Sequence, residues 1–220
     1  MIVFHHIPRT GGISISYNII KSNLDLDYIR IDDVFKTNNM EKIPNNYDFI
    51  YGHFDYNKIP DNCFKFTFIR HPISRLNSLF YFFKKIQLVY NFGHLELLPE
   101  TSLTILIGSQ KCKISSHSPF FANSIEKFID EFLDSNGTFN MNFISEIFVP
   151  NYGKFYDFVG LTEKMPESIS RLNKHIKLDT KNLLVLNNSN PKPLIYKYKE
   201  LEVFYEKDIE IYKKILEQYQ

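Results

Sequence analysis

The sequence predicts an α/β fold in which a central parallel sheet is flanked by helices. Short apolar runs at Met1–His6, Asp48–His53 and Phe64–Ile69 have the length and composition of buried strands. A glycine pair follows the first run and a proline follows the third, as expected where a strand gives way to a helix. Strands that alternate with helices pair in parallel and are covered on both faces, so we expect one domain over residues 1–220.

The remaining expected elements complete this alternation. Helical spacing predicts helices at Ile13–Ile20 and from Pro72 through Phe83. The C-terminal third predicts, in order, a strand at Phe155–Leu161, a helix at about 166–175, a strand at Leu183–Leu186, a loop at Asn187–Pro193 and an amphipathic helix at Tyr198–Tyr219.

Residues from about 91 to 150 interrupt the pattern. Ser124–Leu133 and Asn140–Phe148 have helical spacing, and no clear strand stands out between them and the preceding helix. We therefore expect a helical insert within the single domain.

Composition excludes several classes of protein. A net charge of +1 gives no global basic field, so we expect no nucleic-acid partner. Cys63 and Cys112 match no metal-ligand spacing, and we expect two free thiols, with one disulfide as the alternative. Because there is no apolar run of about 18 residues and no room for a signal peptide before His5, we expect a cytoplasmic protein without a transmembrane segment.

The segment His6–Ser14 has the features of an anion-binding turn between a strand and a helix. Backbone N–H groups at a helix N-terminus favour a bound phosphate, and glycines allow its close approach. The candidate binding residues are Arg9, Thr10, Gly11, Gly12, Ile13 and Ser14. An ordinary turn with a solvated arginine is the alternative. The cation precedes the glycines, so the segment is not a Walker A loop.

A second candidate anion site lies in the segment Phe66–Phe82. Arg70 ends a predicted strand, Pro72 begins a helix, and Ser78 follows Arg70 by eight positions. A guanidinium and a hydroxyl that converge on one point suit a phosphate. The alternative is a surface arginine and an unrelated helical serine.

Together the two segments resemble the cofactor-binding motifs of the PAPS-dependent sulfotransferases. PAPS is 3′-phosphoadenosine-5′-phosphosulfate. The first segment resembles P-K-T-G-G-T-S, with Arg9 in place of lysine and Ile13 in place of threonine. The second resembles R-D-P-x-x-R-x-x-S, with His71 in place of aspartate. The resemblance implies a P-loop-like fold, PAPS as cofactor with PAP as product and no metal, the 5′-phosphosulfate at the first segment, and the 3′-phosphate at Arg70 and Ser78.

His53 is the candidate catalytic base, and Arg9 would stabilise the departing phosphate. An acceptor hydroxyl needs a base near neutral pH, and His53 follows a predicted strand at the edge where α/β proteins bind ligands. The stretch Tyr51–Tyr56 resembles H-G-H-x-x-Y of the heparan sulfate (uronosyl) 2-O-sulfotransferases, which implies a carbohydrate acceptor. Packing or capping is the alternative for His53, and Asp55 either orients it or caps a turn.

Weaker matches complete the prediction. Phe158–Glu163 resembles the family's V-G-x-T-E strand and turn, and Lys192 in the predicted loop is a candidate third phosphate contact. A P-loop kinase and a non-catalytic nucleotide- or glycan-binding module remain as alternatives. The sequence leaves the oligomeric state open.

Overall fold

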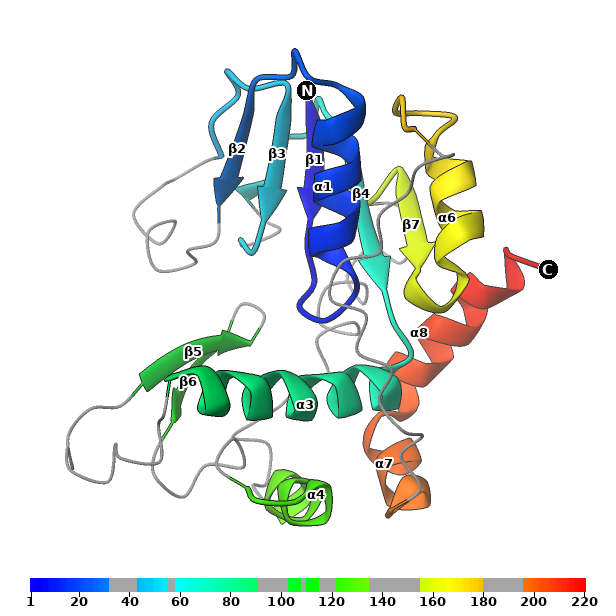
Figure 1. The fold of residues 1–220 in the computed structure, drawn as a ribbon. Coiled ribbons are helices and arrows are strands. Elements are labelled where there is room, and N and C mark those ends of the chain that lie inside the picture. The colour runs from blue at the N-terminus through cyan, green and yellow to red at the C-terminus, as the bar shows by residue number, and fades with distance from the viewer. Residues whose placement is uncertain are drawn as a thin grey trace.

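A five-stranded parallel sheet forms the centre of the computed structural model, which describes residues 1–31, 43–54, 58–90, 103–107, 110–114, 122–134, 155–179 and 196–220. The strands run in the order β2 (Tyr28–Ile31), β3 (Phe49–Gly52), β1 (Ile2–His5), β4 (Phe64–Ile69) and β7 (Phe158–Leu161) (Figure 1). Every neighbouring pair is parallel. The predicted α/β fold class is therefore confirmed.

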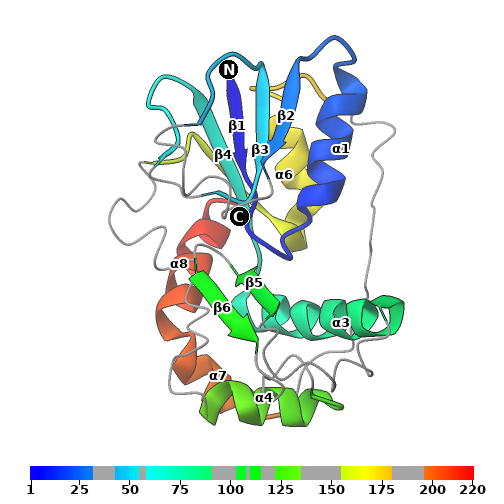
Figure 2. The same cartoon turned by 90° about the vertical axis from the view of Figure 1, so that its left-hand side faces the viewer.

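The two faces of the sheet carry different side chains of the same strands because successive residues point to opposite sides. Phe4 and Phe66 face α1 (Gly12–Ser22) and α6 (Met165–Leu172), whereas Val3 and Ile50 face a separate cluster with Ile31. Figure 2 shows α1 and α6 together on one side of the sheet. Burial on both faces explains why these strands appear as continuous apolar runs in the sequence.

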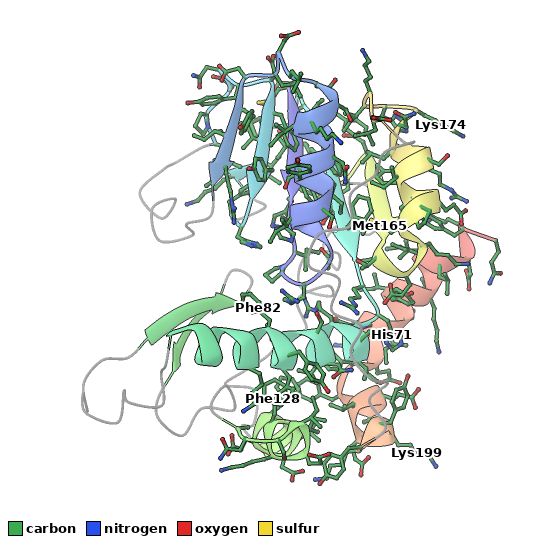
Figure 3. All side chains as sticks on the ribbon, in the orientation of Figure 1. His71, Phe82, Phe128, Met165, Lys174 and Lys199 are labelled. Atoms are coloured by element: carbon green, nitrogen blue, oxygen red, sulfur yellow. The ribbon has the colours of Figure 1, made fainter. Side chains whose placement is uncertain are left out.

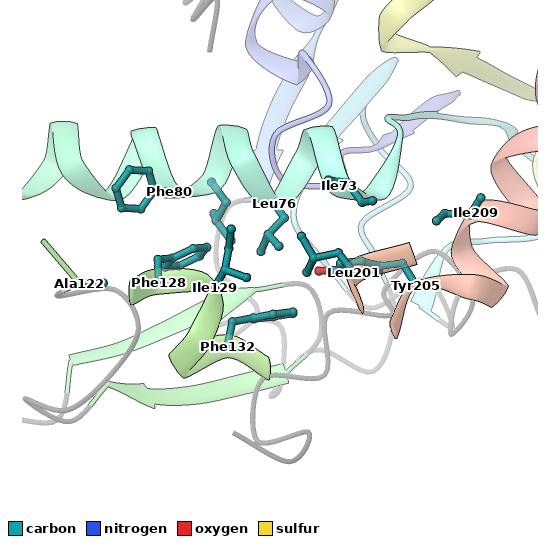
Figure 4. Close-up of a cluster of buried hydrophobic side chains, with 11 residues drawn as sticks. Ile73, Leu76, Phe80, Ala122, Phe128, Ile129, Phe132, Leu201, Tyr205 and Ile209 are labelled. Carbon is teal, nitrogen blue, oxygen red and sulfur yellow. The ribbon is translucent and has the colours of Figure 1, made fainter. Parts of the chain in front are cut away.

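A second core lies beyond the carboxyl ends of the strands, under α3 (Pro72–Tyr90). Helices α4 (Ile125–Asp134), α7 (Tyr198–Phe204) and α8 (Glu206–Glu217) contribute to it (Figure 4). Its fully buried members include Leu76, Ile129 and Tyr205. This core holds α3 across the end of the sheet, so α3 lies opposite the loop that precedes α1 (Figure 1).

Three expectations need correction. The insert is not purely helical, because β5 (Leu103–Ile107) and β6 (Gln110–Ile114) form an antiparallel pair ahead of α4. Only Gly and Ser separate the two strands in the sequence, which is a hairpin signal. The short edge strand β2 was not predicted, since its sequence YIRI is brief and half polar.

The third correction concerns the C-terminal helix, expected as one element over Tyr198–Tyr219. It is two helices, α7 and α8, that join at Tyr205. Tyr205 is fully buried and has φ −98° and ψ 18°, outside the helical range. Packing of this ring in the second core therefore overrides local helical propensity.

Several expectations fall outside the described residues: the helix at Asn140–Phe148, the strand at Leu183–Leu186 and the loop with Lys192. The expected helix at about 166–175 is present as α6, preceded by a 3-10 turn at Thr162–Lys164. In the described part of the chain, none of the helices has the length and apolarity needed to cross a membrane.

Candidate functional site

The carboxyl ends of four neighbouring strands meet at the edge of the sheet that faces α3 (Figure 1). His5 of β1 pairs with Gly52 of β3 on one side and with Thr67 of β4 on the other. Ile69 of β4 pairs in turn with Leu161 of β7. The segments that follow these strands emerge side by side, and they begin at His6, His53, Arg70 and Thr162.

The phosphate loop, residues 6–14, is held in a turn that directs the start of α1 toward this edge. Gly11 has φ 84°, a left-handed conformation that glycine adopts without steric cost. The Thr10 hydroxyl donates to the Ile7 carbonyl at 2.7 Å, and the Thr162 hydroxyl donates to the Thr10 carbonyl at 2.9 Å. The Thr10 side chain therefore supports the loop from within, and its predicted contact with phosphate remains a prediction.

The first turn of α1 presents its backbone N–H groups where the loop ends. Gly12 begins the helix, and its neighbour Ile13 is 45% exposed while Ser14 is buried. No acidic residue lies in this first turn to compete with an anion for the helix dipole. The residues that the sequence predicted for phosphate binding thus surround a helix N-terminus, the usual setting for such a site.

Arg9 crosses from the loop to α3. Its Nε and Nη2 donate to the Ser78 Oγ at 3.2 and 3.1 Å, and its guanidinium lies 4.6 Å from the centre of the Phe82 ring. Figure 3 shows Phe82 on α3, just below the loop. Burial and the nearby charge of Arg70 lower the pKa of Arg9 to about 10, so it stays protonated at neutral pH.

Arg70 brings a second guanidinium to the same place. Its Nη1 lies 3.5 Å from the Arg9 carbonyl oxygen, and its Nε is buried without a hydrogen-bond partner among the described residues. A buried donor of this kind normally forms a hydrogen bond, because a buried donor without one costs about 1–3 kcal/mol. Two adjacent guanidinium groups that still have N–H donors available suit the binding of a phosphate.

Glu163 is the acidic neighbour of Arg70, but its carboxylate accepts hydrogen bonds from other groups. Its Oε1 accepts the backbone N–H of His71 at 3.0 Å and lies 4.0 Å from Arg70 Nε. Tyr212 also hydrogen-bonds to Glu163, and burial together with that carboxylate raises the pKa of Tyr212. Burial lowers the pKa of Arg70, and Glu163 opposes that effect. Glu163 therefore compensates the charge of Arg70 without covering its donors.

His53 lies on the other side of the phosphate loop, directly after β3. Its backbone N–H donates to the Ile31 carbonyl at 2.8 Å, and its Nδ1 lies 2.7 Å from the His6 carbonyl oxygen. A carbonyl only accepts, so Nδ1 carries the proton, and Nε2 is the lone-pair nitrogen of the neutral ring. That tautomer suits a base that receives a proton at Nε2.

Gly52 sets the direction in which His53 leaves the strand. Its φ is 139°, and an added Cβ would lie 2.1 Å from the Ile31 carbonyl oxygen. Other residues would be strained in this backbone conformation and would also collide with β2. The glycine before the candidate base is therefore a structural requirement of its position.

The structure thus brings Arg9, Arg70 and Ser78 together and places His53 beside the same loop. Sequence reasoning missed the contact between His53 and His6 and the position of Glu163 between Arg70 and Tyr212. For the contact between His53 and His6, the available signal was the pair of adjacent histidines, His5 and His6, in the sequence. Asp55 and Lys192 lie outside the described residues.

Comparison with known proteins identifies the family of this chain. A family model described as the sulfotransferase family matches residues 1–220, and the chain belongs to that family. Among solved structures, the chain is similar to mouse sulfotransferase SULT7A1 complexed with PAP, with 14% identity and a TM-score of 0.37. The similarity covers 81% of this chain and 58% of that chain, so it spans a little over half of the mouse protein. No curated protein matches the chain.

Proposed function

We propose that this chain is a sulfotransferase that moves a sulfuryl group from PAPS to a hydroxyl of a carbohydrate acceptor. The observation that carries the proposal is the convergence of Arg9, Arg70 and Ser78 beside the N-terminus of α1. Family membership gives the class of reaction, and these contacts support the nucleotide that the class uses.

The nucleotide would be held at both of its anionic ends. Arg70 and Ser78 would bind the 3′-phosphate, where the Arg70 Nε supplies a buried donor that lacks a partner among the described residues. Arg9 and the backbone N–H groups of the phosphate loop would hold the 5′-phosphosulfate end. Since Arg9 hydrogen-bonds to Ser78, the two ends of the site are in direct contact.

When bound, PAPS supplies the sulfuryl group that is transferred to the acceptor oxygen. The role of His53 is to accept the proton of the acceptor hydroxyl at Nε2 while its Nδ1–H stays on the His6 carbonyl. Arg9 would stabilise the negative charge that develops on the departing phosphate, as a permanent cation rather than a proton donor.

The carbohydrate acceptor rests on the resemblance of Tyr51–Tyr56 to the uronosyl transferases. A net charge of +1 argues against a site for long, densely sulfated chains and favours a smaller glycan. Radiolabelled PAPS offered with a panel of neutral and acidic oligosaccharides would identify the acceptor by the product that gains label.

The decisive experiment for the nucleotide is calorimetry of PAP, 5′-AMP and ATP binding to wild type and to Arg70→Ala. PAP should bind most tightly, and Arg70→Ala should weaken PAP about 10- to 150-fold, the equivalent of about 1.5–3 kcal/mol for a bond to a charged group. Binding of 5′-AMP should change little.

Arg171→Ala is the matched control, because Arg171 forms its ion pair with Glu167 on α6 and packs on Tyr219. Its PAP affinity should equal that of wild type. If PAP binds no better than 5′-AMP and Arg70→Ala changes neither, the proposal is wrong. Tight PAP binding without label transfer to any acceptor would instead indicate a binding module.

A further inference from the structure

His6 contacts the candidate base from several directions. Its carbonyl oxygen accepts the Nδ1–H of His53 at 2.7 Å, and its backbone N–H donates to the Gly52 carbonyl at 2.9 Å. The two imidazole rings also stack, with centres 4.4 Å apart and planes inclined by 30°. Main chain and side chain of one residue therefore both define where the His53 ring lies.

The ring of His6 is half-buried and packs against two neighbouring residues. It stacks on Phe4 with ring centres 5.6 Å apart. A Cβ added to Gly12 would lie 2.0 Å from the His6 Cδ2 and Nε2, so the ring occupies the space directly beside the first residue of α1. His6 thus lies between the helix start that would hold the phosphosulfate and the ring that would deprotonate the acceptor.

The electrostatic setting keeps His6 out of proton transfer. Burial lowers its pKa well below the usual value, and the neighbouring charges of His53, His5, Arg30 and Arg9 lower it further. A neutral His6 ring can stack on His53 in either of its protonation states without a second positive charge beside it.

We propose that His6 is a positioning residue that fixes the tautomer and the orientation of His53. The inference deepens the proposed function and rests on it, because it assigns His6 a role in the same transfer reaction. The hydrogen bond to the His6 carbonyl selects the Nδ1–H form, and the stacked ring prevents His53 from turning away from that carbonyl. A side chain at Gly12 would displace the His6 ring, because the ring fills that space.

The test compares His6→Ala with His6→Phe, which keeps an aromatic ring in the stack. In His6→Ala, kcat should fall roughly 10- to 100-fold because the base is misplaced, while PAP affinity stays near that of wild type. His6→Phe should recover most of the lost kcat. Circular dichroism and urea unfolding of both variants identify any loss of activity that comes from unfolding.

A second readout does not depend on activity. Nitrogen-15 NMR of the His53 ring should show the Nδ1–H tautomer in wild type and in His6→Phe, and a mixture with the Nε2–H tautomer in His6→Ala. An unchanged His53 tautomer together with wild-type kcat in folded His6→Ala would overturn the proposal. Loss of kcat with an unchanged tautomer would overturn it too, since the effect would not pass through His53.

Failure of the proposed function gives a different result. If His53→Ala keeps full kcat, His53 is not the base, and the tautomer measurement still decides whether His6 orients its ring. If PAP does not bind at all, the sulfotransferase proposal fails independently of either histidine.

Discussion

Burial lowers the pKa of a basic group on each side of the phosphate loop, but it leaves different charge states on the two sides. On the cationic side, formed by Arg9, Arg70 and Ser78, burial and a neighbouring charge lower the pKa of Arg9 to about 10, which leaves it charged at neutral pH. On the histidine side, formed by His6 and His53, the same kinds of cause lower the pKa of His6 from 6.5 and leave it neutral.

The difference shows how one edge of a sheet can serve two chemical tasks. Desolvation penalises a charge on either side, but an arginine starts so far above neutral pH that it remains a cation. A histidine starts near neutral pH, so the same penalty preserves a neutral ring. Binding of an anion requires the first result, and the second lets the neutral His6 ring stack on His53 without adding a positive charge beside it.

The largest expected effect comes from removing the base on the histidine side. His53→Ala should lower kcat by about 10²- to 10⁴-fold, the usual contribution of a general base, while PAP affinity stays unchanged. Steady-state transfer rates and PAP calorimetry on the same preparation measure the two quantities.

His53→Asn is the matched control for structure, because its amide can still donate to the His6 carbonyl but has no basic nitrogen. It should lose as much kcat as His53→Ala. His175→Asn should keep full activity, since His175 stacks on Phe64 at the start of β4, at the opposite end of the strands. Retention of kcat in His53→Asn would show that His53 acts only through structure.

The next effect tests the cationic side. Ser78→Ala removes the hydroxyl that accepts from Arg9 and that would donate to the 3′-phosphate. PAP affinity should fall about 10- to 150-fold, or about 1.5–3 kcal/mol, and discrimination against 5′-AMP should shrink with it. Ser74→Ala, one turn earlier on α3, is the control, and equal PAP affinities in the two variants would contradict the assignment.

A smaller effect on stability should follow from Gly52→Ala. The φ of 139° and the nearby Ile31 carbonyl oxygen make a side chain unfavourable there, at a cost of about 1–3 kcal/mol in the free energy of unfolding. Urea denaturation measures this cost. A wild-type midpoint would mean that the turn between β3 and His53 adopts another conformation without strain.

The smallest expected effect is a pH dependence of stability. Because the pKa of His6 is lower in the folded chain than the usual value of 6.5, the unfolded chain binds protons more readily below that pH. Stability should be complete above about pH 6.5 and fall as the pH decreases through the window between the unfolded and folded pKa values. Burial lowers the pKa of His71 as well, which adds to the same trend.

His6→Phe separates the two histidines. Urea midpoints measured at several pH values should fall less steeply for this variant than for wild type, because the contribution of His6 is removed. Identical slopes for the two proteins would mean that His6 binds a proton equally well in the folded and unfolded chain.

The elements that depend on local pattern were predictable. β1, β3 and β4 are continuous apolar runs because both faces of the sheet are covered, and the glycine pair and Pro72 mark the starts of α1 and α3. Strand ends in a parallel sheet meet at one edge, so the predicted position of His53 at that edge also followed from the sequence.

The tertiary structure decided what local pattern does not encode. β2 exists because it pairs with β3, and the helix break at Tyr205 exists because that ring is buried under α3. The direction of the Arg9 side chain toward Ser78, 69 residues away, depends on how α3 crosses the end of the sheet.

The sequence by itself determined the fold class, the order of the motifs and the residue types available for binding an anion and accepting a proton. Only the tertiary structure decided that His6 holds the ring of His53 and that Glu163 leaves the donors of Arg70 uncovered. The physical reason is that hydrogen bonds and ring stacking depend on distances of a few ångströms between segments far apart in the chain. Those distances are set by packing of the whole domain.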